Sequence, residues 1–202
     1  MSEWYPGPEN IFAAFRHPIT AINYVLLGES PYPRQQSANG YAFWDAKVKD
    51  LWSQSGLSKE VNRATSLRNF IKMLLVASGA LSDDVSQEAI VHLDKNLYIQ
   101  TATQLFEGML RKGFMLLNAC LVYRENEVPY HAKHWKPFMD VIFERLSRVK
   151  PEIQCILFGK IAREVPQTQL FNGITAEHPY NISFIRNPVV LNFFKLNDDK
   201  GQ

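Results

Sequence analysis

The sequence has few cysteines, and their number and spacing fit no metal-binding motif. Its 202 residues include only Cys120 and Cys155, both within apolar segments, so we interpret them as buried thiols. Two cysteines cannot supply the four thiolates of an iron–sulfur cluster. No cysteine or acidic residue stands at zinc-finger spacing from the histidine pair, His131 and His134. We therefore predict a protein that uses no metal, cluster or other cofactor.

Membrane-spanning and secretory features are missing as well. No apolar run approaches the length that crosses a bilayer, and the first ten residues have neither a basic patch nor an apolar core. We expect an intracellular protein without a membrane partner: cytoplasmic, nucleoid-associated in a bacterium, nuclear in a eukaryote. The net charge of +2 permits DNA binding without arguing for it, because a local basic face matters more than the total charge.

The composition and the apolar patterns fit one α/β domain. Hydrophobic residues make up 46% of the chain and charged residues 21%, as in ordinary globular proteins. Strands alternating with helices predict parallel pairing, with helices on both faces of the sheet. We predict a three-layer α/β/α sandwich around a four-stranded, mainly parallel twisted sheet, as a single domain over 1–202 with an irregular arm at 1–20 and a tail at 197–202.

Apolar runs and amphipathic periodicity locate the expected elements. Strands are expected at residues 22–27, 114–118, 153–158 and 174–176. Helices are expected at residues 10–16, 47–54, 63–78, 100–111, 135–146 and 160–165, and Thr65 or Ser66 is expected to cap the helix at 63–78.

The segment from Gly28 to Trp44 follows the first predicted strand and is rich in turn residues. Gly28 ends the strand, and the stiffened loop after it carries Glu29, Ser30 and Tyr32. In open α/β sheets, ligands bind at the carboxyl ends of strands. The segment is therefore either a ligand-binding loop or an ordinary exit from a strand.

Two more polar residues follow predicted strands. Asn118 closes an apolar run, where an amide is costly to bury unless it is paired. It is either a structural amide or a ligand-recognition group, because an amide donates and accepts hydrogen bonds side by side. His178 follows the fourth predicted strand and is likewise either structural or functional. Ser30, Asn118 and His178 would converge at one edge of the sheet.

Four segments, in the same order, resemble the motifs of uracil-DNA glycosylases. GESPYP and the residues up to Phe43 resemble GQDPYH and a GLAF-like block. Residues 64–70 resemble a DNA-backbone loop followed by SLxNI, although its prolines are missing here. The segment from LLN at 116–118 resembles the LLN block and its SHxxxGWxxF continuation, with Tyr130 in place of Ser. HPYNIS at 178–183 resembles HPSPLS.

The resemblance implies base excision from DNA, for which the nucleotide must leave the stack. His178 would donate a hydrogen bond to uracil O2 as negative charge grows on the leaving base. Asn118 would bind the uracil edge, and Phe43 would stack on the flipped base. Tyr32 would lie against C5 and exclude the methyl group of thymine.

The same resemblance assigns contacts to the DNA itself. Ile182 stands at the position of the wedge leucine that fills the gap left by the flipped nucleotide. Ser183 would contact a phosphate. Thr65 and Ser66 would donate to another phosphate near a helix N-terminus. The expected partner is uracil-containing DNA, single- or double-stranded, bound by a monomer.

The first motif departs from the family pattern at three positions: Glu29 replaces Gln, Ser30 replaces Asp and Pro33 replaces His. The family's Asp positions water and faces the cationic sugar, and a carboxylate there is worth ~4 kcal/mol at 4 Å and an effective dielectric near 20. A serine hydroxyl orients water but carries no charge. Glu29 restores a negative charge one residue away. We therefore expect a uracil-DNA glycosylase with attenuated activity, in which His178, Ser30 and Glu29 are catalytic.

Two alternatives stay open. One is a weak or inactive DNA-binding relative, such as a damage sensor or a scaffold for replication or repair. The other is an enzyme that acts on a free nucleoside or nucleotide. The retained Asn118, Phe43 and His178 favour the glycosylase, whereas Ser30 and Pro33 favour the DNA-binding relative. The wedge-like HPYNIS loop argues against a free nucleoside, which needs no stack replacement.

Overall fold

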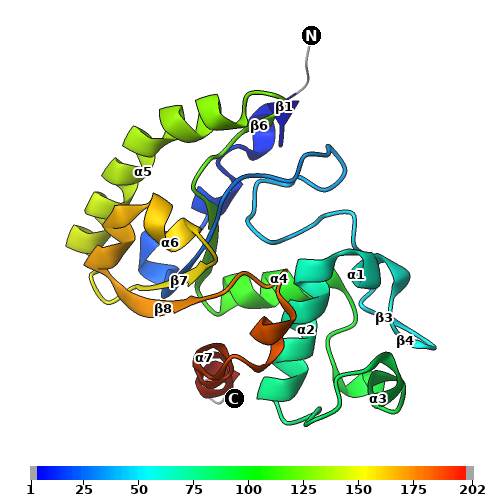
Figure 1. Cartoon of the computed structure of the whole chain (residues 1–202). Helices are drawn as coiled ribbons and strands as arrows, with labels where there is room; N and C mark the ends of the chain where they lie inside the picture. The colour runs from blue at the N-terminus through cyan, green and yellow to red at the C-terminus, as the bar shows by residue number, and fades with distance from the viewer. Residues whose placement is uncertain (1–3, 199–202) are drawn as a thin grey trace. The chain divides into compact units, whose positions relative to one another are not determined.

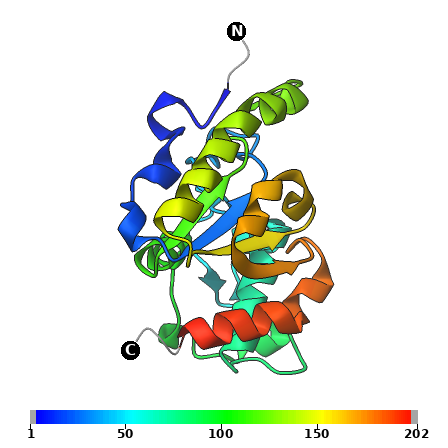
Figure 2. The same ribbon diagram turned by 90° about the vertical axis from the view of Figure 1, so that its left-hand side faces the viewer.

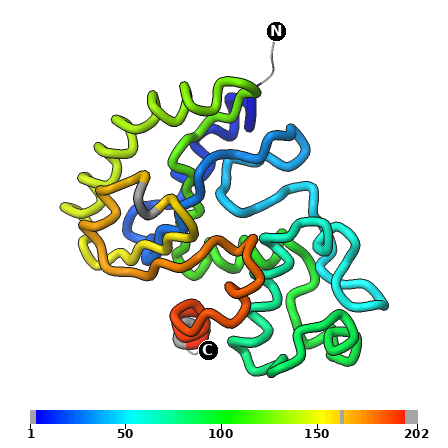
Figure 3. Tube along the Cα trace, viewed as in Figure 1, coloured from blue at the N-terminus to red at the C-terminus, as the bar shows by residue number. Residues whose placement is uncertain are grey.

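The computed structural model describes residues 4–198, with all of their side chains except those of 162–163 and 196–198. The chain divides into two compact units, which are described separately (Figures 1 and 3). Unit 1 comprises the described parts of Met1–Lys47 and Met109–Gly173. Unit 2 comprises those of Val48–Gly108 and Ile174–Gln202. The single domain over 1–202 stays a prediction.

Strands and helices alternate along much of the chain (Figure 1). The strands are β1 (Trp4–Tyr5), β2 (Tyr24–Gly28), β3 (Trp52–Ser53), β4 (Gly56–Leu57), β5 (Phe114–Asn118), β6 (Tyr123–Arg124), β7 (Gln154–Phe158) and β8 (Asn172–Ala176). The α-helices are α1 (Lys59–Arg63), α2 (Thr65–Ala77), α3 (Gln87–Val91), α4 (Ala102–Arg111), α5 (Val128–Val149), α6 (Ile161–Glu164) and α7 (Pro188–Asp198). The 3-10 helices are η1 (Pro8–Asn10), η2 (Ala13–Phe15), η3 (Ile19–Ala21), η4 (Lys95–Leu97), η5 (Pro166–Leu170) and η6 (Ile182–Arg186).

The central sheet has the strand order β5-β2-β7-β8. β5 and β7 both pair with β2 in parallel, so that Leu26 lies opposite Leu116 and Ile156. Nearly all residues of these three strands are buried, as expected for strands covered on both faces. The four predicted strands correspond to the four strands of the sheet. The predicted α/β fold with a central parallel sheet and flanking helices is confirmed.

Helices α5 and α6 cover one face of the sheet (Figure 2). Met139, Phe143 and Leu146 of α5 belong to the same buried cluster as alternate residues of β2, β5 and β7. Those strand residues are Val25, Leu27, Met115, Leu117, Cys155 and Leu157. This packing follows from the side-chain periods of strands and helices. Every second strand residue faces the helix, and the apolar side chains of the helix recur every three or four residues.

Helix α5 begins at Val128 rather than at residue 135. Pro129 lies in its first turn, where a missing N–H leaves no intrahelical bond unmade, and Pro137 lies inside the helix. Apart from a half-buried His131, residues 128–134 are exposed. Apolar periodicity therefore revealed only the part of the helix that packs on the core.

The helix predicted at 47–54 is wrong. Trp52 and Ser53 form β3, which pairs with Gly56 and Leu57 of β4 in an antiparallel hairpin. Gly56 has φ +112°, a conformation that residues with a side chain adopt at a cost, and it allows the chain to reverse there. The prediction of a helix missed this turn.

The helix predicted at 63–78 is α2, which runs from Thr65 to Ala77, and Arg63 is instead the last residue of the separate helix α1. Ala64 is the N-cap of α2, and no side chain caps it. The expected cap from Thr65 or Ser66 is wrong, because both residues already belong to the first turn of the helix.

The predicted arm and tail are more regular than expected. Residues 4–20 include β1, η1 and η2 in place of one helix at 10–16. Helix α7 continues to Asp198, and the rest of the predicted tail, 199–202, lies outside the described residues, as do 1–3. Among the described helices, none combines the length and the apolarity that crossing a membrane requires.

Candidate functional site

In unit 1, the parallel strands β2 and β5 end side by side, and predicted site residues lie at their ends. β2 ends at Gly28 and β5 ends at Asn118, and these two residues pair in register. The ladder continues beyond the strands: the Ala119 N–H donates to the Gly28 carbonyl at 2.8 Å, and the Cys120 N–H donates to the Glu29 carbonyl at 2.9 Å. The backbone of the first motif is thereby fixed against the segment that carries Asn118.

The Asn118 side chain lies against Gly28. Asn118 is only 2% exposed. A Cβ atom at Gly28 would lie 2.6 Å from Asn118 Oδ1 and 2.9 Å from the Cβ of Ala42, so no side chain fits there without displacing one of them. Ala42 is itself fixed, because its N–H donates to the Leu116 carbonyl at 3.1 Å. The missing side chain of Gly28 therefore leaves the room in which the Asn118 amide lies.

Two aromatic residues of the loop after β2 reach the same edge. The Tyr32 hydroxyl donates to the Phe43 carbonyl at 3.3 Å. Phe43 has φ +63°, and its ring meets that of Phe158 edge to face, with centroids 6.0 Å apart. Burial and the charge of Asp45 raise the pKa of Tyr32, so its hydroxyl keeps its proton and remains a donor.

The sequence did not single out Phe158. It is the last residue of β7 and is 1% exposed. Its ring supports Phe43, which the family resemblance assigns to base stacking. The signal in the sequence is its position, an aromatic residue that closes a buried apolar run, but only the strand pairing places it beside the loop.

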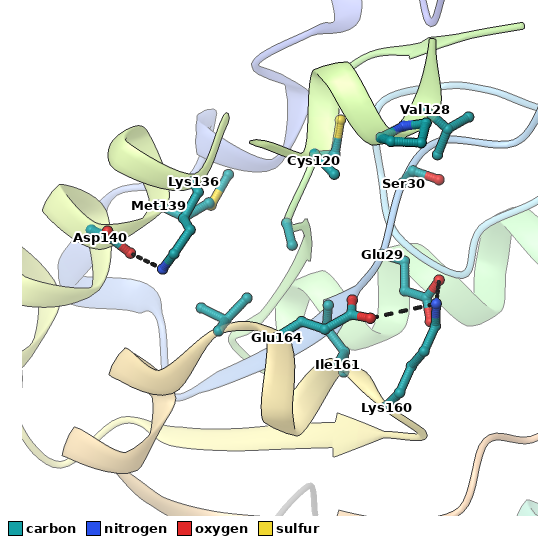
Figure 4. Close-up of a pocket in the computed structure, with 14 residues that line it drawn as sticks. Glu29, Ser30, Cys120, Val128, Lys136, Met139, Asp140, Lys160, Ile161 and Glu164 are labelled. Atoms are coloured by element: carbon teal, nitrogen blue, oxygen red, sulfur yellow. Dashed lines mark hydrogen bonds and ion pairs between the residues drawn. The ribbon is translucent and has the colours of Figure 1, made fainter. Parts of the chain in front are cut away.

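Glu29 and Ser30 line a cavity of about 380 Å³ that Asn118, Tyr32 and Phe43 do not line (Figure 4). Its other walls come from the segment after β5, from α5, and from Lys160 through α6, and they include Cys120, Val128, Met139, Ile161 and Glu164. Lys160 Nζ lies 3.7 Å from Glu29 Oε2 and 3.4 Å from Glu164 Oε1. Glu29 and then Glu164 raise the pKa of Lys160, so this cation offsets part of the charge that Glu29 carries.

Both cysteines are buried thiols, as predicted. The Cys120 thiol donates to the Val122 carbonyl at 2.9 Å. Burial raises the pKa of both, that of Cys155 to about 12. Within residues 4–198, no three His, Cys, Asp or Glu side chains are grouped as metal ligands. The prediction that the protein needs no metal stays a prediction.

In unit 2, the turn after β8 determines how His178 presents its ring. The Tyr180 N–H donates to His178 Nδ1 at 3.1 Å, and the Asn181 N–H donates to the His178 carbonyl at 2.9 Å. Because Nδ1 accepts this hydrogen bond, the proton of the neutral ring lies on Nε2. In the neutral ring of His178, Nε2 is therefore the nitrogen that carries the N–H.

A buried amide of α2 holds this turn in place. Asn69 is 2% exposed, and its Nδ2 donates to the Pro179 carbonyl at 2.8 Å. Arg68 Nε donates to Asn69 Oδ1 at 3.4 Å, so both ends of the amide are fixed. The sequence placed Asn69 in a motif without giving it a role. The available signal was a polar residue on the apolar face of a helix.

Beyond the turn, η6 lies against α2 in unit 2. Phe184 is fully buried and stacks on Phe70, with ring centroids 6.5 Å apart. By contrast, Ile182 is 78% exposed and Tyr180 is 68% exposed. A firmly packed support thus carries two large exposed side chains.

Ser183 and the α2 N-terminus complete the predicted DNA contacts. The Ser183 hydroxyl donates a hydrogen bond to the Glu177 carboxylate. Asn187 Nδ2 donates to the same carboxylate at 2.6 Å. Burial opposes ionisation of Glu177, but its own backbone N–H and these two side chains together hold its pKa below the usual value. Thr65 and Ser66 are half-buried in the first turn of α2, where backbone N–H groups lack intrahelical partners.

Known proteins resemble this chain over almost its whole length. The crystal structure of the wild-type UNG from Nitratifractor salsuginis is 41% identical, with a TM-score of 0.92, covering 96% of this chain and 80% of that one. The chain belongs to the uracil-DNA glycosylase family. A uracil-DNA glycosylase of Corynebacterium glutamicum is 28% identical over 198 residues, which are 91% of this chain and 72% of that protein.

The fold extends to more distant glycosylases. The mimivirus uracil-DNA glycosylase is 20% identical with a TM-score of 0.59, covering 88% of this chain and 57% of that one, and this likeness shows the fold alone. No family model matches the chain.

The hydrogen bond from Asn69 gives a testable prediction. Asn69→Ala removes the donor to the buried Pro179 carbonyl and should lower the free energy of unfolding by about 1–3 kcal/mol. It should also speed hydrogen exchange of the Tyr180 and Asn181 amides, which chemical denaturation and exchange measured by NMR would show.

The matched control is Asn62→Ala, which removes a similar bond from Asn62 Nδ2 to the Leu57 carbonyl, 3.0 Å long, elsewhere in unit 2. It should leave exchange at Tyr180 and Asn181 unchanged. Equal exchange in the two variants would mean that Asn69 does not hold the turn.

Proposed function

We propose that this family member flips uracil, or a related deaminated base, out of DNA and hydrolyses its N-glycosidic bond. Membership of the glycosylase family supports the reaction class. The observation that carries the proposal is the state of His178, whose Nδ1 accepts from the Tyr180 N–H and whose Nε2 is therefore the donor. Excision requires such a donor at the base oxygen where negative charge develops.

Asn118 would read the uracil edge. An amide whose orientation is fixed discriminates between bases, because it matches the O4 and N3–H pattern of uracil and opposes the reversed pattern of cytosine. Its burial and its contact with Gly28 support such a fixed orientation. Phe43 would stack on the base, and Tyr32 would exclude the thymine methyl group.

The other predicted residues would act on the DNA strand. Ile182, highly exposed beside the buried Phe184, would fill the gap left by the flipped nucleotide. Ser183 would bind a phosphate once its hydroxyl turns away from the Glu177 carboxylate, and Thr65 and Ser66 would bind another phosphate at the positive end of α2. The protein would act as a monomer wherever genomic DNA is held, in the bacterial cytoplasm or the eukaryotic nucleus.

The catalytic carboxylate is where this chain would be weakest. Ser30 can orient water but supplies no negative charge to the developing sugar cation. Glu29 has the charge, but Lys160 lies 3.7 Å from it. This ion pair favours attenuated excision, and it is also the observation that favours the alternative function, a DNA-binding damage sensor or scaffold.

Single-turnover release of base from synthetic DNA tests the proposal. Wild-type protein should release uracil from single- or double-stranded oligonucleotides. Parallel oligonucleotides that contain a thymine mispair, hypoxanthine or xanthine measure which bases it prefers. His178→Ala should slow release by about 10²–10³-fold, because one electrostatic donor contributes that much, and Asn118→Ala should slow it comparably.

The matched control is His92→Ala, at an exposed histidine in unit 2, which should leave the rate unchanged. If the wild type binds these oligonucleotides but releases no base, the sensor or scaffold function is correct and the glycosylase proposal is not.

A second experiment tests the account of the first motif. Ser30→Asp should raise the single-turnover rate of uracil release by about tenfold or more, because it places a negatively charged carboxylate beside the sugar, where positive charge develops. Ser30→Asn has nearly the same shape without the charge and should not raise it. A rate that is unchanged in Ser30→Asp, or raised equally in both variants, would show that the missing charge does not limit excision.

A further inference from the structure

The turn that holds His178 presents an exposed aromatic ring with no role in the chemistry described above. Tyr180 is 68% exposed, and it stands two residues before the exposed Ile182. Large exposed apolar side chains that lie close together on a protein surface mark contact sites more often than isolated ones do. The two side chains differ in shape, since Ile182 is a compact aliphatic group and Tyr180 a flat ring.

The backbone that carries this ring is fixed on both sides. The Tyr180 N–H donates to His178 Nδ1 at 3.1 Å, and its carbonyl accepts from Asn69 Nδ2 at 3.4 Å. Pro179, the preceding residue, is buried. The exposure of Tyr180 is therefore a property of an ordered turn, and little backbone entropy would be lost when its ring meets a partner.

We propose that Tyr180 stacks on a nucleobase of the bound DNA next to the nucleotide gap that Ile182 fills, an inference that rests on the proposed function. Every base offers a flat face to an aromatic ring, so the contact needs no particular sequence. An aliphatic side chain can fill the gap but has no flat face, so Ile182 would fill the gap and Tyr180 would stack on the neighbouring base.

The contact also predicts a strand preference. Base faces are accessible in single-stranded DNA and hidden inside a paired duplex. Tyr180 therefore adds more to the affinity for single-stranded DNA than to that for a fully paired duplex.

The test uses oligonucleotides with a tetrahydrofuran abasic residue in place of the uracil nucleotide and a fluorescent 2-aminopurine on one side of it. Wild-type protein should change the 2-aminopurine fluorescence through stacking. Tyr180→Ala should lose that change and bind the single strand about tenfold more weakly. Its binding to the paired duplex should weaken less. Tyr180→Phe keeps the ring and should match the wild type.

Catalysis provides an independent readout. Tyr180 contacts His178 only through its backbone N–H in the bonds described, and alanine keeps that group. At saturating protein, Tyr180→Ala should therefore release uracil at the wild-type rate, while half-saturation shifts to higher protein concentration. The control variant is Leu97→Ala, at a residue 77% exposed elsewhere in unit 2, which should change neither quantity.

The outcomes separate the two proposals. If the wild type releases uracil and Tyr180→Ala equals it in affinity and in 2-aminopurine fluorescence, stacking by Tyr180 is wrong and the glycosylase function stands. If the wild type neither binds the probes nor releases uracil, the proposed function fails and the role of Tyr180 fails with it.

Discussion

The contact between Gly28 and Asn118 is the constraint on which the candidate base-binding residues of unit 1 depend. Parallel pairing brings the ends of β2 and β5 side by side, and the missing side chain of Gly28 leaves room for the amide of Asn118. Ala42 closes the same space from the loop, and the next residue, Phe43, reaches Phe158 at the end of β7. One small residue thus links the strand register to the position of the Asn118 amide.

In unit 2 the corresponding constraint is the pair of hydrogen bonds that hold the turn after β8. Asn69 fixes the Pro179 carbonyl from α2, and the Tyr180 N–H fixes the tautomer of His178. Both donors are neutral groups bonded over short distances, so they determine geometry without adding charge. The first motif is different, because its only carboxylate, Glu29, lies next to the cation of Lys160. Family membership alone therefore does not determine how fast this chain would work.

The sequence predicted β2, β5 and β7 well because they are buried, nearly continuous apolar runs that end at Gly28, at Asn118 and just before Gly159. It failed where local pattern and tertiary context disagree. Residues 47–54 are polar enough for a surface helix, but Gly56 turns the chain into a hairpin, and the exposed first turns of α5 carry no apolar period. The ends of predicted strands pointed to several site residues, and the motif resemblance supplied their roles and the remaining site residues. Sequence reasoning did not identify Asn69 and Phe158 as important, because each acts through a contact with a residue far away in the sequence.

The role of Asn118 as the reader of the base is tested most directly by an NMR titration of nitrogen-15-labelled protein with free uracil. The side-chain amide signal of Asn118 should shift in a saturable way with uracil and should respond far less to cytosine at the same concentration, because cytosine presents the reversed donor and acceptor pattern. Equal responses to the two bases, or none from Asn118 in a protein that still releases uracil from DNA, would contradict that role.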